Sequence, residues 1–586
     1  MTMRRTILVC QGTGCVSSNS TQIQREFERE IIEHQLNDVK VKLTGCHGFC
    51  QIGPTVIIEP DDILYCRLKP ADVKEIVNSH LINGIPVGQL HYHDLTTGNP
   101  VPKWTDIPFY KRQQRMITTH CGYINPEEIE EYLAIGGYRA VRQAVLAMTP
   151  EEIIEEVKSS QLRGRGGAGF LTGVKWDFAR RSNGGGAYQK YIICNADEGD
   201  PGAFMDRVIL ESTPHSIIEG MIIAAFAIGA SRGFIYVRAE YPLAIHRIEV
   251  AITQARTKGF LGSHIFGSDF DFDLQINQGA GAFVCGEETA LMASIMGKRG
   301  NPRPRPPYPA SEGLWGRPTN INNVKTYAYI PLIIKNGARL FADIGLEKSR
   351  GTAVFCLTGK INNSGLIEVP MGIKLRQIIY DIGGGIPNGK KFKAIQTGGP
   401  SGGCLPERYL DKEVTYESLE AAGSILGSGG MIVLDEDICM VDMAKYFINF
   451  TQEESCGKCS PCRIGTEKLL NILEKIVNGQ GQEEDLGLLE ELGELVKNGS
   501  LCGLGQTAPN PVLSAIKYFR DEYIAHIVDK RCPAKVCKAL IEYYIDEDQC
   551  TGCLLCLRGC PTNAITERRG ERTKEGEVRE SDKVPS

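Results

Sequence analysis

The chain carries the run Arg163-Gly164-Arg165-Gly166-Gly167-Ala168-Gly169-Phe170, and Lys175 and Trp176 follow it closely. Glycine reaches positive φ angles and lets a phosphate or a planar ring approach the backbone, where N–H groups supply donors. Four glycines in eight residues therefore predict a loop that holds a nucleotide-type cofactor. Lys175 could be a solvated helix lysine, but its place beside the loop favours contact with phosphate.

Three further segments fit the same prediction. They combine glycine with acidic side chains that could bind sugar hydroxyls, and they span residues 195–202, 279–283 and 285–289. An RNA-binding arginine–glycine segment would need repetition and interleaved aromatic residues, which are absent. The usual dinucleotide fingerprint has another order of glycines and a distant acidic residue, which are also missing. We therefore expect a different nucleotide fold.

Length and composition set the outer limits. A chain of 586 residues predicts several domains, and its net charge of −6 argues against broad nucleic-acid binding. It has no apolar run of about 18 residues and no signal-peptide pattern, so a cytoplasmic location is expected. Most of the 21 cysteines fall in short-spaced groups, which points to metal or iron–sulfur ligation. The isolated Cys66, Cys356 and Cys439 are expected to be ordinary core residues.

The first 102 residues predict an iron–sulfur domain. Apolar strands at 7–9 and 39–43 each run into a cysteine pair, with an amphipathic helix at 21–33 between them and a third strand at 55–59. Four thiolates on neighbouring loops suit a 2Fe–2S cluster, with zinc or redox thiols as alternatives: Cys10, Cys15, Cys46 and Cys50. The pattern resembles the thioredoxin-like 2Fe–2S ferredoxins.

Two helices, at 126–135 and 138–148, are expected in a connector of residues 103–147. Thr149 and Pro150 then predict a helix start, as N-cap and first helical residue. After the glycine-loop domain, residues 352–358, 366–369 and 394–399 are expected as strands and 374–382 as a helix. The glycine runs there predict turns, because the Lys-Ser/Thr partner of a phosphate loop is missing. A small β-grasp-like module is expected.

The strongest local signal is a set of three cysteines at two-residue spacing with one distant partner. Such spacing suits a 4Fe–4S cluster, and the ligands would be Cys456, Cys459, Cys462 and Cys502. Helices at 466–477 and 483–497 would return the fourth cysteine to the loop. Zinc is the weaker alternative.

The last part of the chain carries a bacterial ferredoxin motif, Cys550, Cys553, Cys556 and Cys560 followed by Pro561. In two-cluster ferredoxins the fourth cysteine of such a motif ligates the other cluster. No second motif follows here, so either Cys560 completes a single 4Fe–4S cluster, or another cysteine does, or none forms. Upstream, zinc could be held by His526, Cys532 and Cys537, with a fourth ligand missing. Alternatively, Cys532 or Cys537 serves the neighbouring cluster.

Together these motifs resemble the NADH-binding flavoprotein subunit of respiratory complex I and its relatives. In that family FMN and NADH share one pocket, and the resemblance assigns residues to it by motif. FMN phosphate and ribose would meet Gly164, Arg165, Gly167 and Lys175. The ribityl chain and flavin edge would meet Asn195, Asp197 and Glu198. The pocket would be completed by Gly286, Glu287, Ile321, Asn322, Asn323 and Thr326.

The resemblance also implies an NADH site. Its residues would be Phe170, Phe178, Asp200, Glu288, Arg305 and Tyr308. Asp200 stands where complex I has glutamate, and Lys325 also replaces a glutamate. Arg305 and Tyr308 replace lysine and phenylalanine, which keeps charge and aromaticity. These departures concern substrate preference rather than the flavin.

Over nearly its whole length the chain resembles the flavin (beta) subunit of multimeric NAD-dependent iron-only hydrogenases. The implied fold is α/β and multidomain: thioredoxin-like 2Fe–2S domain (1–102), connector (103–147), FMN/NADH-binding α/β domain (148–345), β-grasp SLBB-like domain (346–430), helical-bundle 4Fe–4S domain (431–525), truncated ferredoxin-like part (526–570) and disordered tail (571–586).

This resemblance implies a diaphorase that exchanges electrons between NAD(H) and a catalytic hydrogenase subunit, with a small thioredoxin-like 2Fe–2S subunit as a further partner. The half-length ferredoxin motif suggests independence from ferredoxin, although a ferredoxin partner and an electron-bifurcating complex remain alternatives. A formate dehydrogenase diaphorase and a relay subunit with an empty flavin site are two further hypotheses. Flavin content and the co-purifying catalytic subunit would separate them.

Overall fold

The computed structural model describes residues 5–95, 97–182, 189–541, 543, 545, 549–561 and 564–566. The chain divides into two units, Met1–Leu540 and Ile541–Ser586. Across the described parts, none of the helices combines the length and apolar character needed to span a membrane. The expected tail at 571–586 lies outside the described residues.

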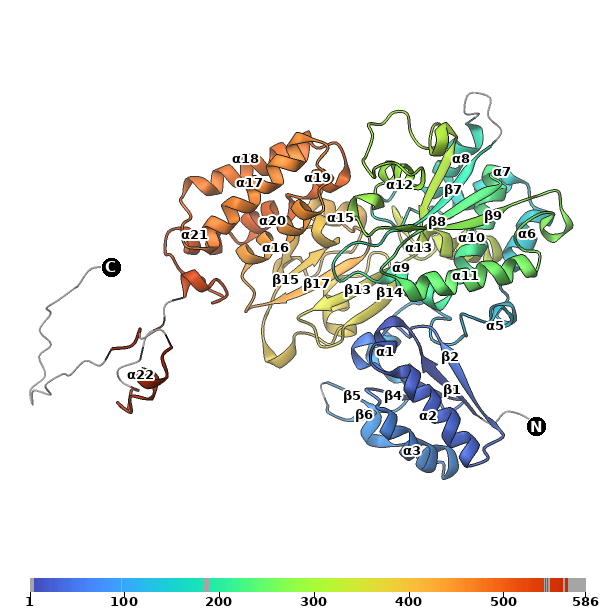
Figure 1. The fold of residues 1–586 in the computed structure, drawn as a ribbon, viewed down its shortest axis with the longest axis horizontal. Coiled ribbons are helices and arrows are strands. Elements are labelled where there is room, and N and C mark those ends of the chain that lie inside the picture. Colours follow the sequence, from blue (N-terminus) through green and yellow to red (C-terminus); the bar gives the residue numbers. More distant parts are fainter. Residues whose placement is uncertain are drawn as a thin grey trace, which may run out of the picture. The chain divides into compact units, whose positions relative to one another are not determined.

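A four-stranded sheet of order β2-β1-β3-β4 forms the N-terminal domain (Figure 1). Its strands are β1 (Arg5–Cys10), β2 (Val39–Thr44), β3 (Val56–Glu59) and β4 (Ile63–Tyr65). The first two run parallel, so both cysteine-bearing loops leave the same edge of the sheet. Helix α2 (Ser20–Glu33) buries Ile23 and Phe27 against the sheet. The strand and helix expectations for this domain are confirmed.

The connector contains α5 (Ile129–Ala134) and α6 (Arg139–Ala147), as expected. Helix α7 (Pro150–Ser159) begins with the expected cap. The Thr149 hydroxyl accepts from the backbone N–H of Glu152, and the Glu152 carboxylate accepts from the N–H of Thr149 in return. This capping box fixes where the helix starts, just before the glycine loop.

The flavin-type domain is built on a parallel sheet of order β10-β7-β8-β9. Its strands are β7 (Tyr191–Ala196), β8 (Arg232–Arg238), β9 (Asp273–Gly279) and β10 (Thr319–Asn323). Helix α10 (Pro214–Ile228) is predominantly apolar and lies buried beside α13 (Val324–Asn336). Ligands bind at the carboxyl ends of strands in such sheets, where β7 and β10 carry Asn195 and Asn323.

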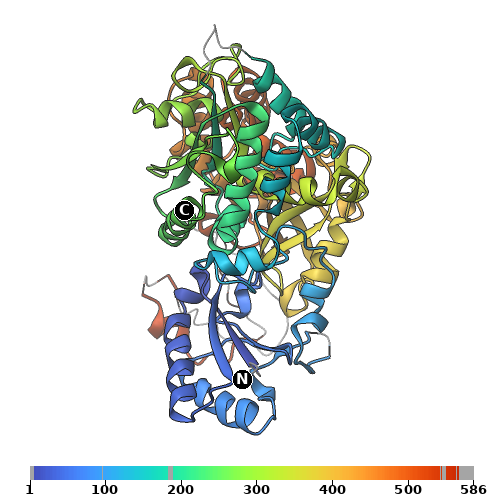
Figure 2. The ribbon, with the colours of Figure 1, turned by 90° about the vertical axis from the view of Figure 1, so that its right-hand side faces the viewer.

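The N-terminal domain, blue in Figure 2, packs against this domain, and hydrogen bonds show that both cysteine loops take part in the contact. Helices α9 (Met205–Ser212) and α11 (Pro242–Thr257) form the contact. The Cys46 N–H donates to the Ser212 hydroxyl at 3.0 Å, and the buried Arg247 guanidinium donates to the backbone oxygen of Gln11 at 3.0 Å. Three N-terminal cysteines therefore share a hydrophobic core with the flavin-type domain.

A mixed five-stranded sheet of order β14-β13-β17-β15-β16 forms the β-grasp-like module. Its strands are β13 (Thr352–Gly359), β14 (Gly365–Pro370), β15 (Phe392–Thr397), β16 (Cys404–Pro406) and β17 (Gly430–Asp435). The central β17 extends past the expected domain boundary at residue 430, because it pairs with both β13 and β15. The expected helix at 374–382 is a π-helical turn, Gln377–Ile382.

A helical bundle completes the first unit. Its members are α16 (Met440–Glu453), α17 (Ser460–Val477), α18 (Glu484–Gly499), α19 (Gly503–Thr507), α20 (Asn510–Tyr518) and α21 (Arg520–Ile527). The expected helices at 466–477 and 483–497 lie in α17 and α18. In the second unit, α22 (Leu555–Gly559) carries part of the ferredoxin motif.

Candidate functional site

The glycine loop lies on the carboxyl end of β10. Gly167 and Gly169 have φ angles of 116° and 64°, which side chains rarely tolerate. A Cβ on Gly166 would lie only 3.0 Å from the Cβ of Asn323, so the loop approaches the strand closely. The Arg165 N–H donates to the Thr326 hydroxyl at 2.9 Å and anchors the loop to α13. The sequence-predicted loop and strand residues therefore share one site.

Asp197 supplies the clearest sign that a ligand belongs there. Both of its carboxylate oxygens are buried and have no hydrogen-bond partner within the described part of the protein. Burial raises the pKa of this carboxyl from 3.8 to about 7, an increase that the Arg238 cation limits. An unpaired buried acceptor is costly, so a donor from a bound molecule fits it. Asn195 beside it donates to the Gly286 oxygen at 2.8 Å.

Lys175 connects the expected flavin and NADH residues. Its ammonium donates to the backbone oxygen of Ile321 at 2.7 Å and lies 3.5 Å from a Glu288 carboxylate oxygen. Arg305 approaches the other oxygen of Glu288 at 2.5 Å. Two cations thus surround one carboxylate at the start of α12 (Glu288–Ile295). This arrangement suits a ligand with phosphate and sugar hydroxyl groups.

Three aromatic side chains assigned to NADH are largely exposed. Phe170, Phe178 and Tyr308 have relative exposures of 52%, 57% and 59%. Phe170 ends the glycine loop, and Phe178 lies on α8 (Thr172–Arg181), two residues after the buried Trp176. Exposed aromatic rings offer flat surfaces on which planar ligands can stack.

Several predicted residues are already bonded inside the protein. The Arg165 guanidinium donates to the backbone oxygens of Thr352 and Arg350, and the residue is 3% exposed. Its side chain is therefore held by the protein itself, and the phosphate contact that the resemblance assigned to Arg165 stays a prediction. The loop arginine instead ties the glycine loop to the β-grasp-like module.

Glu198 and Glu287 act as helix caps. The Glu198 carboxylate accepts from the N–H groups of Asp206 and Arg207 at the start of α9. The Glu287 carboxylate accepts from two N–H groups at the start of α12. The Asn322 oxygen accepts from the Trp176 indole at 2.9 Å. These side chains fix the segments around the predicted site. Their hydrogen-bond partners could not be inferred from residue spacing in the sequence.

Asp200 lies at the boundary with the β-grasp-like module. The Ser428 hydroxyl donates to its carboxylate, and a Cβ on Gly399 would lie 2.7 Å from its Cγ. Burial raises the pKa of Asp200 to about 6, and the Ser428 hydrogen bond opposes that rise. Ser428 was missed because the sequence gives no sign that a serine 228 residues away faces this acid.

The N-terminal cysteines converge as expected. The sulfurs of Cys46 and Cys50 lie 3.6 Å apart, and the neighbouring thiols of Cys15 and Cys46 lower the pKa of Cys10. A Cβ on Gly53 would lie 2.9 Å from the Cys15 sulfur, so that position must stay small. Four thiols on two adjacent loops fit a 2Fe–2S cluster.

The second cysteine set sits at the end of the helical bundle. Cys459 is the N-cap of α17, Cys502 is the N-cap of α19, and a hydrogen bond of 3.2 Å joins the Ser455 hydroxyl and the Cys462 sulfur. Burial raises the pKa of Cys462 to about 11, and the other three thiols contribute. Cys456 thus belongs to a group of four that fits a cubane cluster.

The structure brings a fourth possible ligand, Cys439, to the three residues predicted to bind zinc. Cys439, His526, Cys532 and Cys537 are all buried, and their ligand atoms lie within 4.8 Å of one another. The Cys439 sulfur is 3.3 Å from His526 Nε2, and Nδ1 of that ring is fixed by the Glu522 backbone oxygen at 2.7 Å. Three cysteines and one histidine suit a structural zinc ion.

Two expectations are corrected by this geometry. Cys439 is not an ordinary core cysteine, because its thiol faces the other three ligands, and the Cys537 thiol and His526 ring lower its pKa to about 4. Cys532 and Cys537 belong to this group rather than to the ferredoxin motif. In the second unit, Cys550, Cys553 and Cys556 are exposed, and the Cys560 sulfur accepts from the Ala564 N–H at 3.3 Å.

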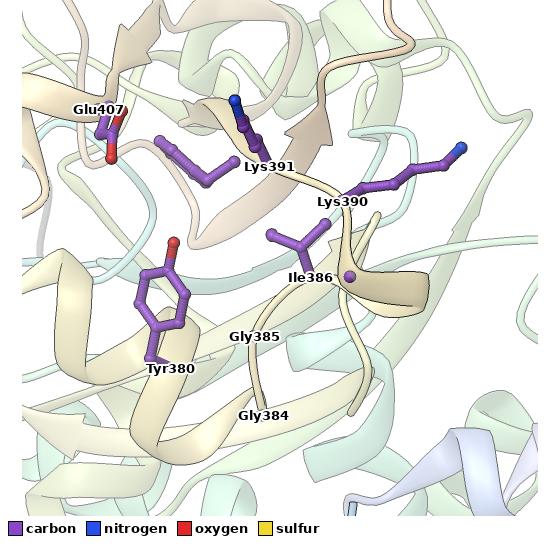
Figure 3. A pocket seen from close by; sticks show the side chains of 9 residues that line it. Tyr380, Gly384, Gly385, Ile386, Lys390, Lys391 and Glu407 are labelled. Carbon is purple, nitrogen blue, oxygen red and sulfur yellow. The ribbon is translucent and has the colours of Figure 1, made fainter. Parts of the chain in front are cut away.

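A cavity of about 460 Å³ opens elsewhere, on the β-grasp-like module (Figure 3). Side chains of Tyr380, Lys391 and Glu407 line it, together with a glycine turn. None of the residues expected to bind flavin, NADH or metal lies there.

Five family models match the chain in the order expected. They are the thioredoxin-like [2Fe–2S] ferredoxin (residues 2–80), the Nuo51 FMN-binding domain (157–332), the SLBB domain (354–405), the NADH-ubiquinone oxidoreductase-F iron–sulfur binding region (442–526) and a 4Fe–4S binding domain (543–566). The expected fold class is confirmed.

Known relatives agree with these matches. The NADP-reducing hydrogenase subunit HndC of Solidesulfovibrio fructosivorans is 58% identical over 456 residues, which cover 78% of this chain and 92% of that one. The NADH-quinone oxidoreductase F 2 subunit of Rhizobium meliloti is 47% identical over 69% of this chain and 96% of its own length. A solved NAD⁺-reducing [NiFe]-hydrogenase in the H₂-reduced state matches with a TM-score of 0.63 and 30% identity, covering 90% and 85% of the two chains. The chain therefore belongs to the family of FMN- and iron–sulfur-binding flavoproteins represented by the F subunits of NADH-quinone oxidoreductases and by their hydrogenase relatives.

Proposed function

We propose that this chain is the NADH-oxidising (or NAD⁺-reducing) FMN and iron–sulfur subunit of a hydrogenase complex. The observation that carries the proposal is the buried carboxylate of Asp197, which has no hydrogen-bond partner among the described residues and lies next to Gly286, just past the carboxyl end of β7 in a parallel sheet. The similarity to a hydrogenase subunit over 92% of that subunit's length supports the choice of complex.

Each part of the site has a role in this proposal. The glycine loop and Lys175 hold the flavin phosphate, and the Asp197 carboxylate accepts a hydrogen bond from the flavin. The exposed rings of Phe170 and Phe178 stack on NADH, and Glu288 binds its ribose hydroxyls. FMN, when bound, converts two-electron hydride transfer into single-electron transfer. Orientation and exclusion of water are the tasks of the protein, so no separate acid–base pair is required.

The cysteine sets carry the electrons onward in this proposal. The group around Cys46 and the group around Cys459 hold one 2Fe–2S and one 4Fe–4S cluster, and the motif at Cys553 holds a further 4Fe–4S cluster. The four-ligand group at Cys439 holds zinc, which has no redox chemistry and so has a structural role.

The test is anaerobic purification of the chain with its natural partners, followed by measurement of flavin, iron and zinc and of NADH-dependent dye reduction. One FMN, one zinc and about ten irons per chain are expected from the ligand count. About six irons would mean that the second unit holds no cluster. A preparation without flavin would refute the diaphorase function and favour a relay subunit. A co-purifying hydrogenase subunit is expected, and a formate dehydrogenase subunit in its place would refute the assignment to a hydrogenase.

A further inference from the structure

Lys325 is a buried cation in an unfavourable place. It is the second residue of α13, and the whole residue is only 1% exposed. Amides at a helix N-terminus carry partial positive charge, so a cation in the first turn is repelled by its own helix. Removal from water adds a second cost. Neighbouring groups must compensate for these two costs, and sites where a sequence accepts such costs are often functional.

The compensation comes from α9. The Lys325 ammonium lies 2.6 Å from one carboxylate oxygen of Asp206, and both side chains are almost fully buried. The other oxygen of Asp206 accepts from the Asn323 amide at 2.5 Å. The Asn323 side-chain oxygen in turn accepts from the Lys325 N–H at 3.0 Å. One ion pair therefore fixes the asparagine that meets the glycine loop at Gly166.

Further acids face the same ammonium. Glu198, whose carboxylate accepts from the Asp206 N–H, and the buried Asp200 both have pKa values that Lys325 lowers against the effect of burial. The Cys356 thiol also interacts with it. Glu198 and Asn323 belong to the predicted cofactor site and Asp206 lies on α9, so Lys325 and its partners link three segments of the chain.

We propose that Lys325 is a positioning residue that, with Asp206, sets the electrostatic potential at the flavin pocket. This inference rests on the proposed function, because it requires FMN to occupy the pocket. Reduction adds negative charge to a flavin, and a fixed ammonium nearby favours that charge while a carboxylate opposes it. The neutral pair leaves the pocket balanced, whereas either partner alone would shift the flavin midpoint potential.

The experiment compares Lys325→Met, Asp206→Asn and the double variant in the holoenzyme, with Lys335→Met as the control. Lys335 lies on the same helix and is exposed. FMN content and the flavin midpoint potential are measured by anaerobic spectroelectrochemical titration. For Lys325→Met we expect the ratio of reduced to oxidised flavin at a fixed potential to fall at least tenfold, which is about 30 mV for a two-electron couple. Asp206→Asn should raise that ratio, and the double variant should return close to the unsubstituted protein.

The opposite signs distinguish an electrostatic role from a structural one. Loss of packing alone would move both single variants in the same direction, and this result or the absence of any shift would overturn the inference. If Lys325→Met does not fold, two results still test the inference: the rise in the ratio of reduced to oxidised flavin in Asp206→Asn, and the reversal of that rise in the double variant. Flavin missing from the unsubstituted chain would overturn the proposed function as well, whereas retained flavin without shifts overturns only the role of Lys325.

Discussion

Replacement of Asp197 by asparagine should stabilise the flavin-free protein and weaken its hold on FMN. The variant removes a charge from a site where both oxygens are buried and unpartnered within the described residues. Ionising a carboxyl whose pKa is about 7 instead of 3.8 costs about 4 kcal/mol. This cost is absent below the unfolded pKa, accumulates as the pH rises toward the folded pKa, and is complete above it. An amide carries no such cost.

The affinity of Asp197→Asn for FMN should fall, although its stability rises. A hydrogen bond to a charged acceptor contributes about 1.5–3 kcal/mol, so the dissociation constant of FMN should rise between about tenfold and a hundredfold. In the native protein FMN affinity should fall as the pH drops below the pKa of about 7, because protonation removes the negative charge that strengthens the hydrogen bond. In Asp197→Asn this pH dependence should disappear.

Two measurements check the prediction on the full chain. Thermal unfolding of the flavin-free protein on both sides of neutral pH reports stability, and quenching of FMN fluorescence reports affinity. Asp269→Asn, which changes an exposed aspartate, is the matched control. A variant that loses stability in mildly alkaline buffer, or that binds FMN as tightly as the native chain, would refute our interpretation of Asp197.

Three further predictions follow from the other sites. Cys439→Ser should remove one zinc per chain and lower the unfolding temperature, while the flavin stays bound. Cys66→Ser changes a buried cysteine outside the metal sites, so this control variant should keep its zinc. Zinc retained by both variants would contradict the ligand assignment. Glu288→Gln should raise KM for NADH about tenfold, which corresponds to a loss of about 1.4 kcal/mol of binding free energy, without changing FMN content. Glu312→Gln, which changes an exposed glutamate, should leave KM for NADH unchanged. Equal KM values for the two variants in steady-state assays would exclude the ribose contact. Cys502→Ser should lower the iron count by about four and abolish the corresponding electron paramagnetic resonance signal, and an unchanged count would place the cluster elsewhere.

Cysteine spacing and glycine content carried most of the sequence prediction, because these ligands and turns lie close together in the chain. Cys46 and Cys50, for example, could be paired from a spacing of four residues. The zinc site needed Cys439, which lies 87 residues before His526, and a single cysteine in an apolar segment looks like core. The hydrogen bonds of the Arg165 side chain could not be predicted either, for the same reason. Its partners, the oxygens of Arg350 and Thr352, lie 185 and 187 residues away, so only the folded structure shows that its donors are already used.

The packing of the N-terminal domain bears on access to its cysteines. Cys10, Cys15 and Cys46 are 4%, 5% and 7% exposed, and they lie under the contact that Arg247 and Ser212 make with the cysteine loops. Once that contact has formed, little of these three thiols is open to solvent. The contact between the two domains therefore also limits what can reach the predicted ligands of the 2Fe–2S cluster.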